Sequence, residues 1–296
     1  MNDITIKVPA TAANLGPGFD CLGCALTLYS YITFSKNSQN VEITGCEKKY
    51  SNKNNLIYLA YKSTLDYLKI DNKNVSINID SKIPIARGLG SSATMLVAGA
   101  VGAYVLNDVK IDKNKILEIT NKIEGHPDNL APAIFGGLTA SLVENNKPII
   151  RKFIINKNWK FITLIPNFRL STKKSREVMP KEITKDDAIY NISRIPLLIN
   201  SLAQGDQNLL HIALNDKIHQ PYRKVLIDHY DDIQKIANDN KIPFCLSGAG
   251  PTLLLIVKNN QNIQNVIEKI NETVKNKWTI KNLDIDDCGF SVVENH

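Results

Sequence analysis

The chain has 296 residues, of which 43% are hydrophobic and 22% are charged, so it is long enough for one large domain or two ordinary ones. This composition excludes a disordered chain, a collagen and a coiled coil. The net charge of +7 comes from scattered lysines and arginines without a run of five like charges, which favours a solvated surface over a nucleic-acid footprint.

The first half of the chain mixes the two periodicities of regular secondary structure. Alternating apolar residues predict strands at residues 4–8, 26–34, 41–44 and 75–79. Apolar residues at helical spacing predict helices at residues 55–68, 92–106 and 112–123. Three further strands are predicted at residues 138–143, 149–155 and 160–166.

The second half repeats this mixture. Helices are predicted at residues 189–202, 208–213, 225–238 and 263–274, and strands at residues 244–246, 252–258 and 289–293. Intermixed strands and helices with hairpin-like connections are typical of an α+β fold rather than a doubly wound parallel sheet. We place the domain boundary near residues 155–170, with an N-terminal domain at residues 1–158 and a C-terminal domain at residues 159–296.

The five cysteines and the apolar segments bear on location. An odd number of cysteines predicts free thiols in a reducing compartment, and Cys21 and Cys24 have no second pair or histidine cluster that would complete a zinc site. The longest apolar stretch, at residues 95–106, is shorter than the roughly 20 residues of a membrane span. The first residues alternate like a strand and do not resemble a signal sequence. We therefore expect a cytoplasmic protein without a membrane partner.

The segment most informative about chemistry opens onto the apolar helix predicted from residue 92. It reads Pro84, Ile85, Ala86, Arg87, Gly88, Leu89, Gly90, Ser91, Ser92 and Ala93. Glycines let backbone amides approach an anion, and a serine that caps a helix N-terminus adds to a site suited to a polyphosphate. The segment lacks the Gly-Lys-Ser/Thr of a P-loop. It fits the G-x-G-x-x-A dinucleotide pattern, but no buried strand runs directly into its first glycine, which argues against that alternative.

Two other loops share its glycine-rich character. Residues 247–252 lie between two predicted strands, where they form either an ordinary hairpin turn or a second wall of a phosphate site. Residues 8–20 follow the first predicted strand and place Asn14 and Asp20 in a loop stiffened by glycine and proline. In this order and spacing, the three segments resemble the motifs of the GHMP small-molecule kinases. The loop at residues 8–20 resembles the branch of that family that phosphorylates homoserine.

Further segments extend this resemblance over nearly the whole chain, at residues 124–133, 171–176 and 219–223. The glycine segment departs from the family at Ala86, where glycine is usual. The resemblance implies an α+β fold with a ribosomal-protein-like N-terminal domain and a ferredoxin-like C-terminal domain, with ATP at the seam. It implies ATP- and Mg²⁺-dependent phosphorylation of the side-chain hydroxyl of L-homoserine, on the route to threonine, by a homodimer.

The resemblance also assigns residues to both substrates. For the acceptor it gives Asn14 and Asp20 to the amino end, Arg176 and Arg223 to the carboxylate, and His126 and Asn129 to the pocket wall. Arginine suits this role because its planar fork binds a carboxylate through two hydrogen bonds. For the nucleotide it gives the glycine segment to the phosphates and the surroundings of Asn55, Leu56 and Ile57 to the adenine.

Metal binding and proton transfer involve a second group of residues. Mg²⁺ is usually held by one or two protein oxygens, and the resemblance assigns it to Ser92 and a helical glutamate. We favour Glu124 over Glu118, because Glu118 lies opposite the apolar face of its predicted helix. Mevalonate-type relatives have an aspartate base where this chain has Asn129, and an asparagine amide cannot accept a proton. The preceding residue, Asp128, is expected to point elsewhere. We therefore expect orientation and charge stabilisation by Asn129, Ser92 and Glu124 to carry catalysis.

Two alternatives remain open from the sequence. Another GHMP kinase, such as a mevalonate-type enzyme, would usually carry Gly-Lys where this chain has Ala10 and Thr11. A non-catalytic regulator with the same fold would have no need of Ser91, Ser92 and a helical glutamate.

Overall fold

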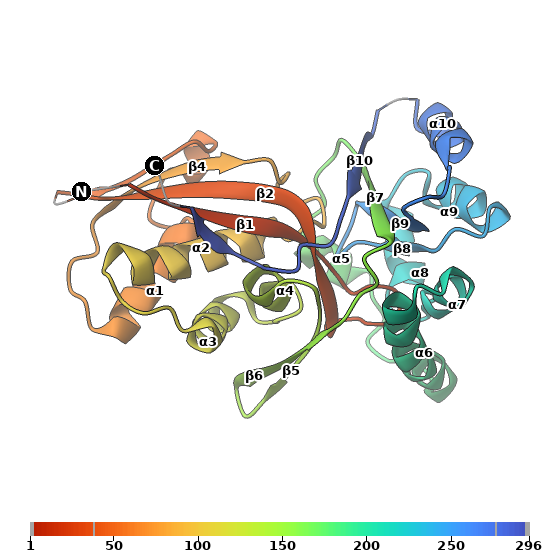
Figure 1. Cartoon of the computed structure of the whole chain (residues 1–296), viewed down its shortest axis with the longest axis horizontal. Coiled ribbons are helices and arrows are strands. Elements are labelled where there is room, and N and C mark those ends of the chain that lie inside the picture. Colours follow the sequence, from red (N-terminus) through yellow and green to blue (C-terminus); the bar gives the residue numbers. More distant parts are fainter. Residues whose placement is uncertain (1–2, 38, 276, 294–296) are drawn as a thin grey trace.

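Two long antiparallel strands, β1 (Ile4–Ala13) and β2 (Leu22–Lys36), form the centre of the first sheet. The computed structural model describes residues 3–37, 39–275 and 277–293. Within them this sheet has the order β11-β1-β2-β4-β3, β5 pairs with the first residues of β2, and β6 pairs with β5. The remaining strands are β3 (Val41–Thr44), β4 (Val75–Ser81), β5 (Leu138–Glu144), β6 (Lys147–Phe153) and β11 (Ser291–Val293). Figure 1 shows β5 and β6 as a projecting hairpin.

Strand β1 is longer than predicted, and this places a site residue on it. The register with β2 shifts between Pro9 and Ala10, after which the pairing continues to Ala13. A bulge of this kind lets a strand bend without ending. The expected loop therefore starts only at Asn14, which has a φ of 68°, and Thr11 lies within the sheet.

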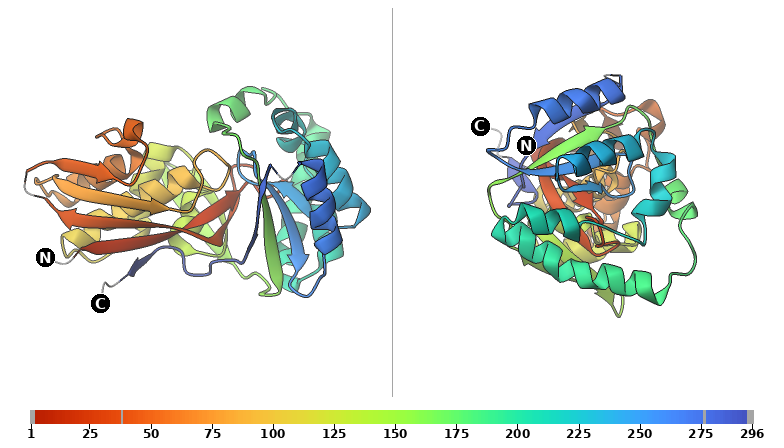
Figure 2. Two further views of the ribbon diagram at one scale, coloured as in Figure 1. Left: turned by 90° about the horizontal axis from the view of Figure 1, so that it is seen from above. Right: turned by 90° about the vertical axis from the view of Figure 1, so that its right-hand side faces the viewer.

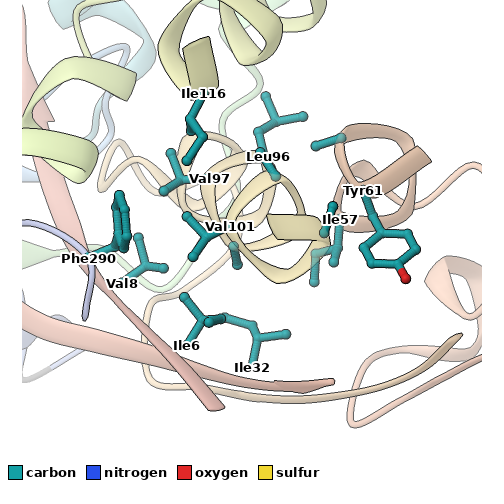
Figure 3. Packing of buried hydrophobic residues seen from close by; sticks show 14 of the residues in the cluster. Ile6, Val8, Ile32, Ile57, Tyr61, Leu96, Val97, Val101, Ile116 and Phe290 are labelled. Carbon is teal, nitrogen blue, oxygen red and sulfur yellow. The ribbon is translucent and has the colours of Figure 1, made fainter. Parts of the chain in front are cut away.

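Four helices cover one face of this sheet, as Figure 1 shows: α1 (Leu56–Leu68), α2 (Ser91–Leu106), α3 (Lys113–Glu124) and α4 (Leu130–Phe135). Helix α2 is apolar on all sides and lies in the middle of the core, where Ile6 and Ile32 of the sheet point toward its Val101 (Figure 3). A helix without a polar face is stable only when it is surrounded. Its position is therefore fixed from every side, and so is the position of its N-terminus.

The second sheet is antiparallel and has the order β10-β7-β9-β8. Its strands are β7 (Trp159–Ile165), β8 (Phe244–Leu246), β9 (Leu253–Lys258) and β10 (Thr279–Leu283). In chain order this is the 4-1-3-2 arrangement of a ferredoxin-like sheet, as predicted. One face packs against α6 (Lys185–Gln204) and α7 (Gln207–Ala213), and the other against α9 (Tyr230–Asp239) and α10 (Gln264–Thr273). Figure 2 shows this lobe beside the first.

The structure adds to the predicted organisation and changes one predicted helix. Strand β11 pairs with β1, so the end of the chain returns to the first sheet, and the division between residues 158 and 159 stays a prediction. The predicted helix at residues 225–238 is broken: a 3-10 turn, η2 (Lys224–Leu226), is followed by α9 only after His229, which has a φ of 61°. Short elements were missed, namely α4, α5 (Thr172–Glu177), α8 (Gln220–Arg223), η1 (Lys48–Tyr50) and β10.

All five cysteines are free thiols, as predicted. No helix in the described part of the chain has the length and apolarity that crossing a membrane requires.

Candidate active site

A cavity of about 890 Å³ lies where the two sheets meet, and the three glycine-containing loops all line it. The glycine segment and the N-terminus of α2 form one wall. The loop after β1 and residues 248–250 form another. The loops that resemble family motifs therefore converge on one space, although they are far apart in sequence.

The glycine segment leaves the N-terminus of α2 open. The residue that caps this helix is Gly90, with a φ of 68° and no side-chain hydrogen bond to the first turn, whereas the sequence predicted a cap by Ser91 or Ser92. A Cβ atom on Gly90 would lie 1.8 Å from Thr11 Oγ1, and one on Gly88 would lie 2.3 Å from the Ser247 carbonyl oxygen. Uncapped amides at a helix N-terminus are donors for an anion.

Ala86 adopts the conformation that glycine would adopt more easily. Its φ is 55°, in the left-handed region, and its carbonyl accepts a hydrogen bond of 3.0 Å from the Leu170 amide. A Cβ atom costs about 1 kcal/mol in this conformation. The departure from the family pattern is thus accommodated by local strain, and the course of the backbone is kept.

Residues 247–252 connect the paired strands β8 and β9, and residues 248–250 of this loop also line the cavity. Ser247 Oγ donates a hydrogen bond of 2.6 Å to the Gly88 carbonyl. The Gly248 carbonyl accepts from Asn14 Nδ2 at 2.8 Å and from Arg223 Nη1 at 3.1 Å. This loop therefore joins the glycine segment, the loop after β1 and the second lobe, and its role as a second wall of a phosphate site stays a prediction.

Ser92 and Glu124 meet at the cavity. Ser92 Oγ donates a hydrogen bond of 2.7 Å to Glu124 Oε2, and both residues line the space. Glu118 instead bonds Lys115 at 2.6 Å and Lys122 at 3.3 Å, and these cations lower the pKa of its carboxyl group. A hydroxyl and a carboxylate oxygen are ligands suited to Mg²⁺. Among the described residues, no group of three or more His, Cys, Asp or Glu side chains could hold a metal by itself.

Asp20 and Arg176 are paired with each other. Their hydrogen bonds of 2.6 Å and 3.0 Å are bidentate, and they raise the pKa of Arg176. Asn14 Oδ1 accepts from the Asp20 amide at 2.9 Å, so the side-chain amide of Asn14 is used at both of its ends. The sequence assigned Asp20 and Arg176 to opposite ends of the acceptor, and it gave no indication that the two would be in contact.

Arg223 is a buried cation without an acidic partner in the described part of the chain. It is 1% exposed, and Nε donates to the Ser175 carbonyl at 3.3 Å while Nη1 donates to that of Gly248. Burial, reinforced by Arg176, lowers the pKa of Arg223 to about 10. The ring of Phe19 lies 5.0 Å from its Cζ. Arg223 forms no salt bridge among the described residues, and Asp20, Asp216 and Asp128 offset its burial only through space. Because a buried charge is costly when it is not fully compensated, we expect this part of the cavity wall to favour an anion.

His126, Asp128 and Asn129 form a connected group. Asp128 Oδ1 accepts from His126 Nδ1 at 3.1 Å and from the Asn129 amide at 2.9 Å, and this carboxylate raises the pKa of His126. Asp128 lines the cavity and is 2% exposed, and the described hydrogen bonds of its carboxylate go to His126 and Asn129. The expectation that it points away from the reacting hydroxyl stays a prediction. Asn129 Oδ1 in turn accepts a hydrogen bond of 2.7 Å from Thr11 Oγ1.

The assignment of residues to adenine changes in part. Asn55 caps α1, with Oδ1 accepting from the Ile57 amide at 3.0 Å and Nδ2 donating to the Tyr50 carbonyl at 2.9 Å. Its side chain is therefore committed to the helix. Asn55 and Leu56 line the cavity, whereas Ile57 belongs to the core.

Sequence reasoning missed two residues that line this cavity and a third, Thr11, that is fully buried and contacts the lining residue Asn129. Glu47 and Arg169 line the cavity and form an ion pair between the two lobes. Nothing in the sequence linked them, because 122 positions separate them. Thr11 was noted only as a difference from mevalonate-type enzymes, and its contact with Asn129 had no sequence signal beyond its place next to a motif.

Comparisons with known proteins match the whole chain. Two family models apply, GHMP kinases N terminal domain over residues 55–137 and GHMP kinases C terminal over residues 198–276. A homoserine kinase of Clostridium botulinum (strain Langeland / NCTC 10281 / Type F) is 41% identical over 294 residues, 99% of each chain. The crystal structure of homoserine kinase from Cytophaga hutchinsonii has a TM-score of 0.90 at 24% identity, covering 99% of this chain and 98% of that one. A putative homoserine kinase from Listeria monocytogenes has a TM-score of 0.80 at 28% identity, covering 99% and 100%.

Proposed function

This chain belongs to the GHMP kinase family, and we propose that it transfers the γ-phosphoryl group of ATP, with Mg²⁺, to the side-chain hydroxyl of L-homoserine. The observation that carries the choice of acceptor is Arg223, a buried guanidinium without an acidic partner among the described residues. It lies in the same cavity as the Asp20–Arg176 ion pair. An acceptor with a carboxylate and an ammonium group complements this end of the cavity.

The glycine segment supplies the nucleotide end. The open N-terminus of α2 and the turns at Gly88 and Gly90 bring backbone amides to one place, where they would hold the phosphates. Asn54, Leu56 and Met95 line the cavity beyond them and would contact the base. Phosphoryl transfer requires mainly position and charge neutralisation from the protein, and this wall offers both.

Ser92 and Glu124 would hold the metal. Their oxygens are 2.7 Å apart at the start of α2 and the end of α3, so one ion can reach both of them next to the phosphates. Two protein ligands fit the usual coordination of Mg²⁺, which keeps several ligands from water and phosphate. When bound there, the ion would neutralise charge on the transferred group.

The acceptor would be oriented by charges at its far end. The free N–H groups of Arg223 would take the carboxylate through charge-assisted hydrogen bonds, and Asp20 would offer its carboxylate to the ammonium group. Asn129 lines the same cavity as Ser92 and Arg223 and would hold the hydroxyl. Because an amide accepts no proton, orientation is expected to account for more of the rate than a protein base.

A coupled assay of ADP release with L-homoserine, L-threonine, L-serine, mevalonate, galactose and shikimate tests this proposal. We expect strict dependence on ATP and Mg²⁺ and the highest kcat/KM with L-homoserine. A preference for mevalonate or a sugar would contradict it. If none of these acceptors raises ADP release above the background, the result would favour the non-catalytic regulator with this fold.

A further inference from the structure

Thr11 contacts the cavity residue Asn129, and the proposed reaction does not yet use this contact. Thr11 lies on β1 just after the bulge, it is fully buried, and its amide donates to the Leu89 carbonyl at 3.2 Å. Its hydroxyl donates to Asn129 Oδ1 at 2.7 Å. Thr11 thus contacts the glycine segment through its backbone and the acceptor wall through its side chain.

The contact between Thr11 and Asn129 depends on Gly90. A Cβ atom on Gly90 would lie 1.8 Å from Thr11 Oγ1 and 3.2 Å from Asn129 Oδ1. A side chain at position 90 would therefore clash with the hydroxyl, and Thr11 or its surroundings would have to shift. Three segments that are distant in sequence, β1, the cap of α2 and the start of α4, meet at this one hydrogen bond.

This hydrogen bond fixes the orientation of the Asn129 amide, that is, which side its oxygen and its NH₂ group each face. An amide oxygen that accepts from Thr11 leaves the NH₂ group directed elsewhere. Nδ2 lies 3.4 Å from Asp128 Oδ1, at the limit of a hydrogen bond, so its donor capacity is mostly available. Asn129 also lines the cavity. The oxygen is anchored to the fold while the nitrogen is free to bind a ligand.

We propose that Thr11 is a positioning residue, which fixes the side-chain amide of Asn129 with its NH₂ group as a donor toward the reacting oxygens. The proposal rests on the proposed function, because it concerns the same acceptor and phosphate. Thr11 touches neither substrate and acts only through Asn129. An amide turned by 180° would present its oxygen to the negatively charged phosphate and would lose orientation of the acceptor hydroxyl.

Two substitutions at position 11 separate this role from simple packing. Thr11→Val keeps the shape and removes the hydroxyl, and Thr11→Ser keeps the hydroxyl and removes the methyl group. We expect kcat to fall about 10-fold or more in Thr11→Val, with KM for ATP within about twofold of the wild type, since misorientation near the reacting atoms is costly. Thr11→Ser should recover most of kcat.

A double-mutant cycle with Asn129→Ala tests whether the effect passes through the amide. In the Asn129→Ala background, Thr11→Val should cause no further loss of kcat, because the group that it positions is gone. Thr163→Val is the matched control, since Thr163 is a fully buried strand residue outside the cavity whose hydroxyl donates to the Lys281 carbonyl at 3.2 Å. Its kcat should stay at the wild-type value.

Each outcome either supports or overturns the proposal. Equal kcat in the wild type and Thr11→Val overturns it, as does an undiminished loss in the Asn129→Ala background. If Thr11→Val unfolds at the assay temperature, Thr11→Ser and the ¹⁵N signals of the Asn129 side-chain amide decide instead. These signals are expected to keep their wild-type positions only when a hydroxyl is present at position 11. Failure of the proposed function can be told apart, because the wild type already shows it in the acceptor panel. The cycle is then measured with the acceptor that the wild type does use.

Discussion

Ser92 Oγ donates a hydrogen bond of 2.7 Å to Glu124 Oε2, which joins the first turn of α2 to the last residue of α3. The two residues line the cavity, whereas Glu118, six residues earlier on α3, pairs with Lys115 and Lys122. The two glutamates of this helix therefore differ in what they can bind.

The first prediction follows from that difference. Ser92→Ala and Glu124→Ala should each lower kcat by at least about 100-fold and raise the Mg²⁺ concentration required for half-maximal activity, because an oxygen ligand beside the transferred phosphoryl group is lost. Steady-state rates over a Mg²⁺ titration provide the measurement. Glu118→Ala is the control and should stay within about threefold of the wild type. The reverse ranking of the two glutamates would move the metal site to Glu118.

The second prediction concerns Arg223. Its lowered pKa shows that the charged form is penalised in the folded protein, and a shift of this size corresponds to a few kcal/mol. A bound carboxylate would relieve that penalty. In thermal unfolding, L-homoserine should therefore raise the Tm of the wild type more than 3-amino-1-propanol, which has the ammonium and hydroxyl groups without the carboxylate.

A substitution isolates the guanidinium. Arg223→Met should abolish this difference between the two ligands and raise KM for L-homoserine at least about 10-fold. Its Tm without ligand should not fall far below that of the wild type, since replacing a buried charge by an apolar side chain of similar size is often neutral. Arg223→Lys keeps the charge but loses the fork, and it should also raise KM. Unchanged ligand stabilisation in Arg223→Met would show that the carboxylate binds elsewhere.

The third prediction uses the strained backbone at Ala86, whose φ is 55°. Ala86→Gly should leave the free energy of unfolding unchanged or raise it by up to about 1 kcal/mol, because relief of the steric penalty offsets the greater entropy of the unfolded chain. Ala93→Gly, inside α2 and fully buried, is the control and should lower it by about 1 kcal/mol or more. Urea unfolding measures both. A loss of more than 1 kcal/mol in Ala86→Gly would contradict the assignment of strain.

The fourth prediction is a pH dependence of stability from His126 and Asp128. Asp128 raises the pKa of His126 in the folded state, so the pair contributes its full stability below the unfolded pKa of histidine, near 6.5. That contribution is lost as the pH rises through the folded pKa. The difference in unfolding free energy between the wild type and Asp128→Asn should therefore be larger at pH 5.5 than at pH 9.

An exposed pair provides the comparison. His229 and Asp232 are 3.4 Å apart with side chains that are 39% and 66% exposed, and exposed ion pairs contribute little. Asp232→Asn should show a much smaller change with pH in the same urea experiment. A flat difference between pH 5.5 and pH 9 for Asp128→Asn would mean that the His126 contact does not stabilise the protonated imidazole.

Local features of the sequence were sufficient for the parts of the fold that depend on short-range interactions. The apolar run through α2 and the alternation in β1 and β4 predicted the core helix and the sheet, because backbone conformation and amphipathic periodicity act over a few residues. The glycine segment lines the cavity, and its binding of phosphate stays a prediction. The family and its α+β fold are confirmed by the comparisons. The choice of Glu124 over Glu118 also rested on helical periodicity.

Tertiary structure alone decided which of the predicted residues have partners. Asp20 binds Arg176 across 156 positions, Thr11 binds Asn129 across 118, and Arg223 is buried without an acid that the structure describes. Neither periodicity nor capping signals extend over such separations. The return of β11 to the first sheet was hidden for the same reason, since strand pairing depends on the packing of the whole chain. The chemical properties of these side chains depend on contacts that form only when the chain folds, and no local sequence pattern encodes such contacts.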